Sequence, residues 1–369
     1  MKKKIYFQLA TMNVGGVEKS FLGLLTTLSP DDYDIHLGLL SPKGGYMESI
    51  PEYVHVHTVD CYDSLKREIN DPPLQYIKDY VRHGLLIDAF LHLIFYIIFK
   101  INRNRYLFYK YILRNIPQSK EEYDMAFAYA GPSQMVDYYI CKKIRAKEKY
   151  GWIHFDVKKF GIDVGMTRQL YRDYKKIYVV SKQGKQNFDE LFPEFKDKTE
   201  VRYNVVSREQ CESLAETAPT FDDDFQGKRI LTVGRLSKEK GQDVTIDTLK
   251  ILLNQGYDVK WYYVGDGNLR MVCEQKAHDL GISDRVCFLG TQTNPYGYMR
   301  DCDIYMQPSR HEGYCITLAE ARCFTAPIVA TDFVGAKEQL ATYPQSAVTG
   351  MDAKEMANGI IKYLEKRLI

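Results

Sequence analysis

Residues 229–253, RILTVGRLSKEKGQDVTIDTLKILL, have the pattern of a strand, a loop and a helix in succession. The first five residues are mostly apolar, as in a buried strand, and the loop that follows holds two glycines. Residues 244–253 then carry apolar side chains at helical spacing. The alternation continues with a predicted helix at 268–280 and predicted strands at 259–264, 286–289, 304–307 and 328–330. Alternating strands and helices indicate a parallel sheet with helices on both faces.

The same order of elements begins near the N-terminus. Residues 5–9 are a predicted strand, residues 14–18 a glycine turn, and a helix with apolar residues at Phe21, Leu24 and Leu28 follows. Further strands are predicted at 35–40 and 54–59. The sequence therefore predicts an α/β protein with two doubly wound, Rossmann-like domains that face each other across a cleft. Ligands of such domains bind at the carboxyl ends of the strands.

The domain boundary is expected where the chain becomes acidic and polar, between residues 205 and 228. We therefore assign residues 1–205 to an N-terminal domain and residues 206–352 to a C-terminal domain. Residues 353–369 have an amphipathic pattern and predict a terminal helix that crosses back toward the first domain.

Length and composition narrow the functional class. The chain has 369 residues, and 50 Lys and Arg against 48 Asp and Glu give a formal net charge of +2. A nearly neutral chain is not typical of a nucleic-acid-binding protein, so no nucleic-acid partner is expected. The eight cysteines form no C-x-x-C pair and no zinc-type spacing, which is typical of free thiols in a reducing compartment.

Residues 85–120 interrupt the alternating pattern. Residues 85–99 are almost wholly apolar, but this run is shorter than the roughly 20 residues that span a bilayer. Residues 100–120 add basic residues and aromatic residues without any acid. Apolar, aromatic and cationic residues together predict a helix at an anionic membrane surface. The alternative is a helix buried in the N-terminal domain with a solvated basic face.

The strongest local motif is HEGYCITLAE at residues 311–320. It follows a predicted strand and a Pro-Ser-Arg turn, and helical periodicity begins at Tyr314. Glu312 is then expected at the start of this helix and Glu320 about two turns further along. Free amides at a helix start can bind phosphate, and carboxylates nearby can bind sugar hydroxyls. A single pair of glutamates at this spacing is weak evidence without its context.

The context comes from two other loops. Arg235 and Lys240 lie in the loop after the strand at 229–233, and a guanidinium and an ammonium group are natural partners of a diphosphate. Gly265 and Gly267 follow the strand at 259–264 and would let a flat base approach the backbone. Each of these loops alone could simply be a solvated turn.

Together these motifs resemble the retaining nucleotide-sugar glycosyltransferases of family 4, also called glycosyl transferases group 1, which have the GT-B fold. The resemblance covers nearly the whole C-terminal half, in order and in spacing. It rests on Val233-Gly234-Arg235, Lys240-Gly241, Gly265-Asp266-Gly267, Phe288-Leu289-Gly290, Pro308-Ser309, Glu312 to Glu320, Pro327-Ile328-Val329-Ala330 and Glu338. The N-terminal half matches more loosely, through Gly15-Gly16-Val17-Glu18, Trp152-Ile153-His154 and Ser181-Lys182. The resemblance implies that the N-terminal domain binds the acceptor and that the C-terminal domain binds the nucleotide sugar.

The resemblance implies a role for each matched residue. Arg235 and Lys240 would stabilise the diphosphate of the donor as it leaves, and Glu312 would hold hydroxyls of the transferred sugar. His154 would lie near the reacting centre on the acceptor side. These four residues are the predicted catalytic set. The predicted substrate-binding residues are Gly15, Gly16, Gly265, Gly267, Gly313, Tyr314, Cys315, Ile316, Glu320 and Glu338, with Glu320 on the ribose hydroxyls and Glu338 supporting the site.

No cofactor and no metal are expected. Asp301-Cys302-Asp303 spells the metal–diphosphate signature D-x-D, but it precedes a predicted strand at a position where the family has a structural aspartate. His55 and His57 would share one strand face without further ligands and are interpreted as surface residues. Arg270 stands where a G-x-G-x-x-G motif needs its third glycine, and no Walker A motif occurs, so dehydrogenase and P-loop functions are not predicted.

The predicted function is a retaining, metal-independent glycosyltransferase of bacterial polysaccharide or capsule synthesis. It would use a nucleotide sugar, most often a UDP-sugar in this family, and a saccharide or polyprenyl-linked acceptor. Residues 1–13 lack the apolar core of a signal peptide, so the expected location is cytoplasmic, peripheral on the inner face of the plasma membrane. The alternatives are a non-catalytic nucleotide-sugar-binding partner subunit and a nucleotide-sugar 2-epimerase. No oligomeric state is predicted.

Overall fold

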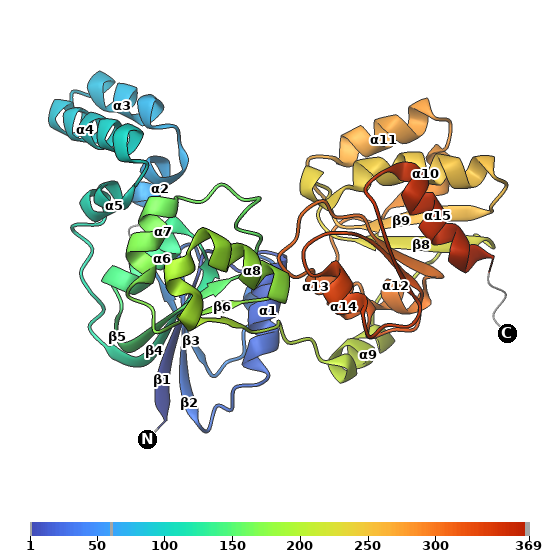
Figure 1. Ribbon diagram of the computed structural model, residues 1–369, viewed down its shortest axis with the longest axis horizontal. Helices are drawn as coiled ribbons and strands as arrows, with labels where there is room; N and C mark the ends of the chain where they lie inside the picture. Colours follow the sequence, from blue (N-terminus) through green and yellow to red (C-terminus); the bar gives the residue numbers. More distant parts are fainter. Residues whose placement is uncertain (1, 60–61, 366–369) are drawn as a thin grey trace. The chain divides into compact units, whose positions relative to one another are not determined.

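The computed structural model describes residues 2–59 and 62–365, and the chain divides into two compact units. Unit 1 contains residues 1–180 and 184–203. Unit 2 contains residues 204–369 together with the short segment 181–183. Both units are α/β domains built on a parallel sheet (Figure 1). The prediction of two doubly wound, Rossmann-like domains is confirmed.

Sheet A of unit 1 has seven parallel strands in the order β3-β2-β1-β4-β5-β6-β7. Their bounds are β1 Lys3–Leu9, β2 Tyr33–Leu39, β3 Val54–Thr58, β4 Glu122–Gly131, β5 Arg145–Ile153, β6 Lys176–Val179 and β7 Thr199–Val201. The helices of this unit are α1 Gly16–Leu25, α2 Tyr62–Asn70, α3 Pro73–Arg82, α4 Leu86–Asn102, α5 Tyr106–Ile112, α6 Gln134–Lys142, α7 Val164–Tyr171 and α8 Lys182–Leu191, of which the first two residues of α8 are grouped with unit 2.

Sheet B of unit 2 has six parallel strands in the order β10-β9-β8-β11-β12-β13. Their bounds are β8 Lys228–Val233, β9 Val259–Val264, β10 Val286–Phe288, β11 Ile304–Gln307, β12 Ile328–Thr331 and β13 Ser346–Thr349. The helices are α9 Arg208–Glu216, α10 Gln242–Asn254, α11 Arg270–Asp279, α12 Tyr296–Asp301, α13 Ile316–Ala321, α14 Ala336–Leu340 and α15 Ala353–Leu364.

The strands of sheet B are apolar throughout because helices cover both faces of the sheet. Successive side chains of a strand point to opposite faces, so each strand supplies two cores. Ile230 packs with Trp261 and Met306 on one face, whereas Leu231 packs with Tyr262 on the other. The continuous apolar runs in the sequence follow directly from this double burial.

Each sheet reverses its winding direction at one point. In sheet A the reversal lies between β1 and β4, and in sheet B it lies between β8 and β11. The loops at the carboxyl ends of these two strands diverge there and leave a crevice, which is where doubly wound domains bind ligands. The fold therefore indicates one candidate site in each unit.

Helices α2 to α5 form an insertion between β3 and β4, and α3 and α4 lie side by side in it (Figure 1). Helix α4 buries only Ala89 and His92. Large apolar side chains on its other face are exposed, and they are Leu86, Ile87, Phe90, Leu93, Ile97 and Ile101. The alternative of a helix buried in the domain core is therefore wrong for this face. Among the described residues, no helix combines the length and the hydropathy that spanning a membrane requires.

Unit 2 begins at residue 204, apart from residues 181–183, and the crossing of the terminal helix toward the first domain stays a prediction. Residues 353–364 form α15, which packs against α10 and buries Met356, Ala357 and Ile360 in the core of unit 2. Residues 366–369, also assigned to the crossing helix, lie outside the described residues. Seven cysteines are free thiols, and Cys61 is outside the described residues.

Candidate active site

The predicted residues of the C-terminal half gather at one edge of sheet B. Arg235 and Lys240 follow β8, Gly265 and Gly267 follow β9, and Glu312 follows β11. Because all strands of the sheet are parallel, these loops lie at the same carboxyl edge. Strands β8 and β11 flank the reversal point of the sheet, so the loops that carry Lys240 and Glu312 form the crevice itself.

Lys240 and Glu312 form an ion pair across this crevice. The Lys240 Nζ atom lies 2.5 Å from Glu312 Oε1, and both side chains are largely shielded from solvent. Burial disfavours the ammonium form, but the Glu312 carboxylate more than offsets it and raises the pKa of Lys240 above its ordinary value. Lys240 therefore carries a fixed positive charge at neutral pH.

A chain of buried polar groups orients the Glu312 carboxylate. Ser309 Oγ donates to Glu312 Oε1 at 2.7 Å, and Gln307 Nε2 donates to Ser309 Oγ at 2.9 Å. Gln307 Oε1 accepts in turn from Tyr305 and Thr317, at 2.8 and 3.1 Å. Gln307 and Ser309 are fully buried, so this network, which begins at the end of β11, holds the Glu312 carboxylate in one orientation.

Two contacts join the loop after β8 to the loop after β11. The Arg310 guanidinium donates two parallel hydrogen bonds to the Asp243 carboxylate, at 2.6 and 2.8 Å. Gly241, with φ +73°, lies so close to the other loop that an added Cβ would be 2.0 Å from the carbonyl oxygen of Pro308. These contacts bring Lys240 and Glu312 together although 72 residues separate them.

Gly241→Ala is expected to lower the free energy of unfolding of unit 2 by at least about 2 kcal/mol and to abolish the Lys240–Glu312 geometry. The alanine would be strained at positive φ and would also clash with Pro308. Gly256→Ala is the matched control, since Gly256 has φ +87° and nothing lies within 4 Å of its added Cβ. Urea unfolding of both variants measures the difference, and equal losses would contradict the role of the Gly241–Pro308 contact.

Arg235 is exposed, and its loop packs closely against the loop after β9. A Cβ on Gly267 would be 2.3 Å from the Leu236 carbonyl oxygen, and one on Gly265 would be 2.1 Å from that of Gly234. The two glycines therefore let the two loops approach each other. Their expected contact with a base stays a prediction, as does the contact of Arg235 with a diphosphate.

Glu320 lies in α13 and is 2% exposed. Its Oε1 atom accepts a hydrogen bond of 2.9 Å from the Tyr296 hydroxyl, which comes from the start of α12. Helix α13 begins at Ile316, two residues later than the periodicity predicts, so Glu312 lies in the preceding loop and not at the first turn. The expected contact of Glu312 with sugar hydroxyls stays a prediction.

The remaining predicted residues of unit 2 lie in the loop before α13, at the start of α13 and in α14. Gly313 and Cys315 are buried, Tyr314 is half-buried, and Ile316 is the first residue of α13. Burial raises the pKa of the Cys315 thiol to about 12, which makes it an unreactive packing group. Glu338 lies in α14 and accepts a 3.1 Å hydrogen bond from the Lys182 backbone amide.

The predicted residues of the N-terminal half lie in unit 1, after β1 and β5. Gly15 is the N-cap of α1 and Gly16 its first residue. His154 follows β5 and packs 4.6 Å from Tyr129, measured between ring centroids. Its Nε2 atom is buried and has no hydrogen-bond partner among the described residues. Burial lowers the pKa of His154 to about 3, although a hydrogen bond with the Tyr129 backbone opposes the shift.

His154 should make unit 1 less stable in mild acid. The imidazole stays neutral in the folded state above about pH 3, whereas the unfolded chain takes up a proton below pH 6.5. The contribution of His154 to the free energy of unfolding is therefore fully present above pH 6.5. It decreases as the pH falls, by about 2 kcal/mol between pH 7 and pH 5. In His154→Gln this part of the loss should disappear.

The measurement is urea unfolding at pH 7 and pH 5 in a Trp261→Phe background, where Trp152 reports on unit 1. Burial raises the pKa of Asp137 to about 7, so protonation of this carboxyl stabilises the folded state as the pH falls. This opposing effect is the same in the protein with His154 and in the His154→Gln variant. Identical pH dependence with and without His154 would contradict a buried neutral imidazole.

The D-x-D aspartates lie at the amino end of β11, at the edge opposite the candidate site. Asp303 accepts from Lys228 Nζ and from the Arg229 amide, at 2.7 and 2.9 Å. Asp301 accepts from Thr220 Oγ1 at 2.6 Å and from Arg300. These bonds support the interpretation of both residues as structural.

No role was predicted from the sequence for the residues that hold the site together. Ser309 and Gln307 orient Glu312, Tyr296 binds Glu320, and the Asp243–Arg310 pair joins the two loops. The only sequence signal was a polar Gln307 at the end of an otherwise apolar strand, because a buried polar side chain needs partners.

Comparisons with known proteins place the chain among sequences and folds of glycosyltransferases. Residues 222–368 match the model of the family described as glycosyl transferases group 1. The chain is 26% identical over 342 residues to N-acetylgalactosamine-N,N'-diacetylbacillosaminyl-diphospho-undecaprenol 4-alpha-N-acetylgalactosaminyltransferase of Campylobacter jejuni, which covers 91% of this chain and 83% of that enzyme. It is 30% identical over 146 residues to the lipopolysaccharide core biosynthesis mannosyltransferase LpsB of Rhizobium meliloti, covering 36% of this chain and 40% of LpsB.

An uncharacterized glycosyltransferase of Methanocaldococcus jannaschii is 25% identical over 171 residues, and the chain spans 41% of its length. That alignment covers 45% of this chain. Among solved structures, HepE of Anabaena in complex with UDP has a TM-score of 0.65 at 17% identity, over 98% of this chain and 90% of HepE. S. aureus TarM has a TM-score of 0.66 at 13% identity, over 99% of this chain and 93% of TarM.

The fold is the GT-B fold of the glycosyltransferases among these solved structures. The match to the glycosyl transferases group 1 covers residues 222–368, which make up most of unit 2.

Proposed function

We propose that this chain transfers a sugar from a nucleotide-diphosphate sugar, a UDP-sugar, to a saccharide or lipid-linked saccharide acceptor of cell-surface polysaccharide synthesis. The observation that carries the proposal is the Lys240–Glu312 pair at the reversal point of sheet B. A carboxylate can accept hydrogen bonds from sugar hydroxyls while the neighbouring ammonium attracts the diphosphate. The UDP complex of the similar fold in HepE supports the choice of nucleotide.

The proposed reaction retains the configuration of the sugar and needs no metal. Lys240 and Arg235 both follow β8, so two cations can compensate the charge that develops on the departing diphosphate. A preorganised positive charge at this point is the largest catalytic contribution expected from the chain. The acceptor hydroxyl would attack from the side on which the diphosphate leaves.

The acceptor would be lipid-linked and the enzyme peripheral on the cytoplasmic face of the membrane. The printed name of the Campylobacter relative includes a diphospho-undecaprenol acceptor. In this chain, helix α4 exposes an apolar face, and Lys100 and Arg103 lie at its carboxyl end. A helix with this composition can insert its apolar face between lipids while the cations contact anionic headgroups.

The double variant Phe90→Glu/Ile97→Glu should lose binding to vesicles that contain anionic phosphatidylglycerol. Both side chains are exposed, 62% and 49%, so the fold is expected to tolerate the change, but two carboxylates would oppose burial in lipid. Leu214→Glu, at an exposed position of α9, is the matched control. Sedimentation with vesicles measures the effect, and equal binding of the double variant and wild type would contradict membrane contact through α4.

The transfer reaction itself is tested by incubating the purified protein with UDP-sugars and a lipid extract in the presence of EDTA. We expect sugar on the extracted lipid, with the anomeric configuration of the donor by NMR. Inverted product would contradict retention, and loss of activity in EDTA would contradict metal independence. Interconversion of the sugar without UDP release would favour a 2-epimerase, and binding without turnover would favour a non-catalytic partner subunit.

A further inference from the structure

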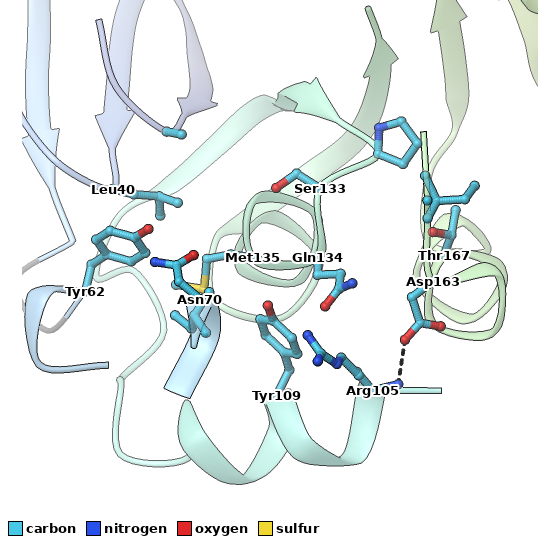
Figure 2. Close-up of a pocket in the computed structure, with 15 residues that line it drawn as sticks. Leu40, Tyr62, Asn70, Arg105, Tyr109, Ser133, Gln134, Met135, Asp163 and Thr167 are labelled. Carbon is cyan, nitrogen blue, oxygen red and sulfur yellow. Dashed lines mark hydrogen bonds between the residues drawn. The ribbon is translucent and has the colours of Figure 1, made fainter. Parts of the chain in front are cut away.

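A cavity of about 300 Å³ lies entirely within unit 1 (Figure 2). Its floor is the carboxyl edge of sheet A, where Ala10 follows β1 and Pro132 to Met135 follow β4. Strands β1 and β4 flank the reversal point of sheet A, which is the usual ligand position of a doubly wound domain. The helical insertion closes the cavity from the other side, through α2 and the start of α5.

Three polar side chains point into this cavity, two from α5 and its N-cap and one from the start of α6. Figure 2 shows the Arg105 guanidinium, the Tyr109 hydroxyl and the Gln134 amide directed toward the same space. Gln134 Oε1 is buried and accepts no hydrogen bond from the part of the chain that the structure describes. A buried acceptor without a donor costs about 1–3 kcal/mol, which a ligand hydroxyl would recover.

Arg105 supplies the charge of the cavity. Its guanidinium stacks over the Phe99 ring, 4.9 Å from the centroid, which holds the planar group in place. Within residues 2–59 and 62–365, no carboxylate forms an ion pair with it. Asp163 lines the same cavity, but its two oxygens accept from the backbone amides of Arg105 and Met166, at 2.7 and 2.8 Å. The carboxylate therefore fixes the loop, and the guanidinium stays available for an anion.

The walls suit a sugar ring. Tyr62 and Tyr109 supply aromatic surface, and Asn70, Ser133 and Thr167 add further polar groups around the rim. A small volume with aromatic walls and several neutral hydrogen-bonding groups is typical of a site for one or two sugar units. The ammonium group of an amino sugar would be repelled by the Arg105 guanidinium, because both groups are positively charged.

We propose that this cavity binds an anionic sugar unit of the acceptor, with its carboxylate or phosphate on Arg105 and a hydroxyl donating to Gln134 Oε1. The inference rests on the proposed function, because it assigns an acceptor subsite to the same enzyme. It also narrows the acceptor class to saccharides that carry a negative charge. The charge can come from a uronate or from a sugar phosphate.

The test is saturation-transfer NMR on the full chain with four sugar probes at millimolar concentration, namely glucuronic acid, glucose 6-phosphate, glucose and glucosamine. Binding of inorganic phosphate, which has no carbon-bound proton, is measured by its displacement of glucose 6-phosphate. We expect the first two to bind more tightly than glucose, and glucosamine to bind least. Glucosamine binding equal to that of glucuronic acid would overturn the charge assignment. Inorganic phosphate binding as tightly as glucose 6-phosphate would overturn the saccharide assignment.

Two variants locate the binding. Gln134→Glu keeps the shape of the side chain and adds a negative charge, so it should weaken binding of both anionic sugars more than tenfold. Arg105→Gln should remove their advantage over glucose. Arg114→Gln is the matched control, because Arg114 is exposed and stacks on Tyr111, outside the cavity lining. Unchanged binding in both Gln134→Glu and Arg105→Gln would overturn the proposal.

A parallel titration with UDP separates this inference from the proposed function. If UDP binds but none of the sugars does, the cavity assignment fails and the nucleotide-sugar site stands. If UDP does not bind, the proposed function itself fails, whatever the sugars do. UDP affinity should be the same in Gln134→Glu as in the wild type, because the cavity belongs to unit 1 and the donor site to unit 2.

Discussion

Replacing Lys240 by alanine should lower kcat/KM for transfer from the UDP-sugar by about 10²–10³-fold. The ammonium group is the cation held at the reversal point of sheet B, 2.5 Å from Glu312. Without it, the negative charge that grows on the departing diphosphate loses its nearest partner. The Glu312 carboxylate also loses its counter-ion, so it should repel the diphosphate. UDP release at varied donor concentration measures the effect.

Lys238→Ala is the matched control for this substitution. Lys238 lies in the same turn, its side chain is exposed, and its structural contact is a backbone one, from its carbonyl oxygen to Arg310 Nη1. Activity close to wild type is expected for Lys238→Ala. Equal loss in both variants would indicate a general effect of charge or folding and would contradict a specific role of Lys240.

Glu320→Ala should weaken UDP binding by about 10–100-fold, because a hydrogen bond to a charged group contributes about 1.5–3 kcal/mol. The proposed partners of the carboxylate are the ribose hydroxyls. Isothermal titration with UDP and with 2′-deoxy-UDP tests this directly. The wild type should bind UDP more tightly than the deoxy analogue, and the variant should bind both alike.

The Tyr296→Phe variant distinguishes the effect of the Glu320 carboxylate from the effect of the hydrogen bond that Tyr296 donates to it. This change removes the hydroxyl that donates to Glu320 Oε1 but leaves the carboxylate in α13. We expect Tyr296→Phe to keep the preference for UDP over 2′-deoxy-UDP. Discrimination that survives in Glu320→Ala would show that another group recognises the ribose.

The sequence predicts the two-domain α/β fold well because local signals repeat. Apolar runs such as residues 229–233 are buried on both faces of a sheet, and glycine loops follow them, so each βα unit can be recognised alone. The loops that carry Lys240 and Glu312 could be placed at one edge for the same reason, since parallel strands end together.

The contacts between these loops could not be predicted in the same way. Asp243 and Arg310, or Gly241 and Pro308, are distant in sequence, and nothing in the local pattern of either loop specifies the other. The start of α13 was also misplaced, because Tyr314 and Cys315 fit a helical pattern although the helix begins at Ile316.

Helix α4 illustrates a different difficulty. Its sequence is apolar on almost all sides, so periodicity could not distinguish a buried helix from one at a membrane surface. Only the packing of α3 and α5 shows which side is covered, and it leaves the face with Phe90 and Ile97 exposed. The cavity at Gln134 was missed because its lining comes from six separate segments of unit 1.

The most direct measurement is release of the nucleoside diphosphate from a panel of UDP- and GDP-sugars, with and without lipid extract, by wild type and Lys240→Ala. We expect release from at least one UDP-sugar, stimulated by the extract and reduced about 10²–10³-fold in Lys240→Ala. Release that is equally fast in the variant, or none from any donor, would contradict a nucleotide-sugar site built on Lys240 and Glu312.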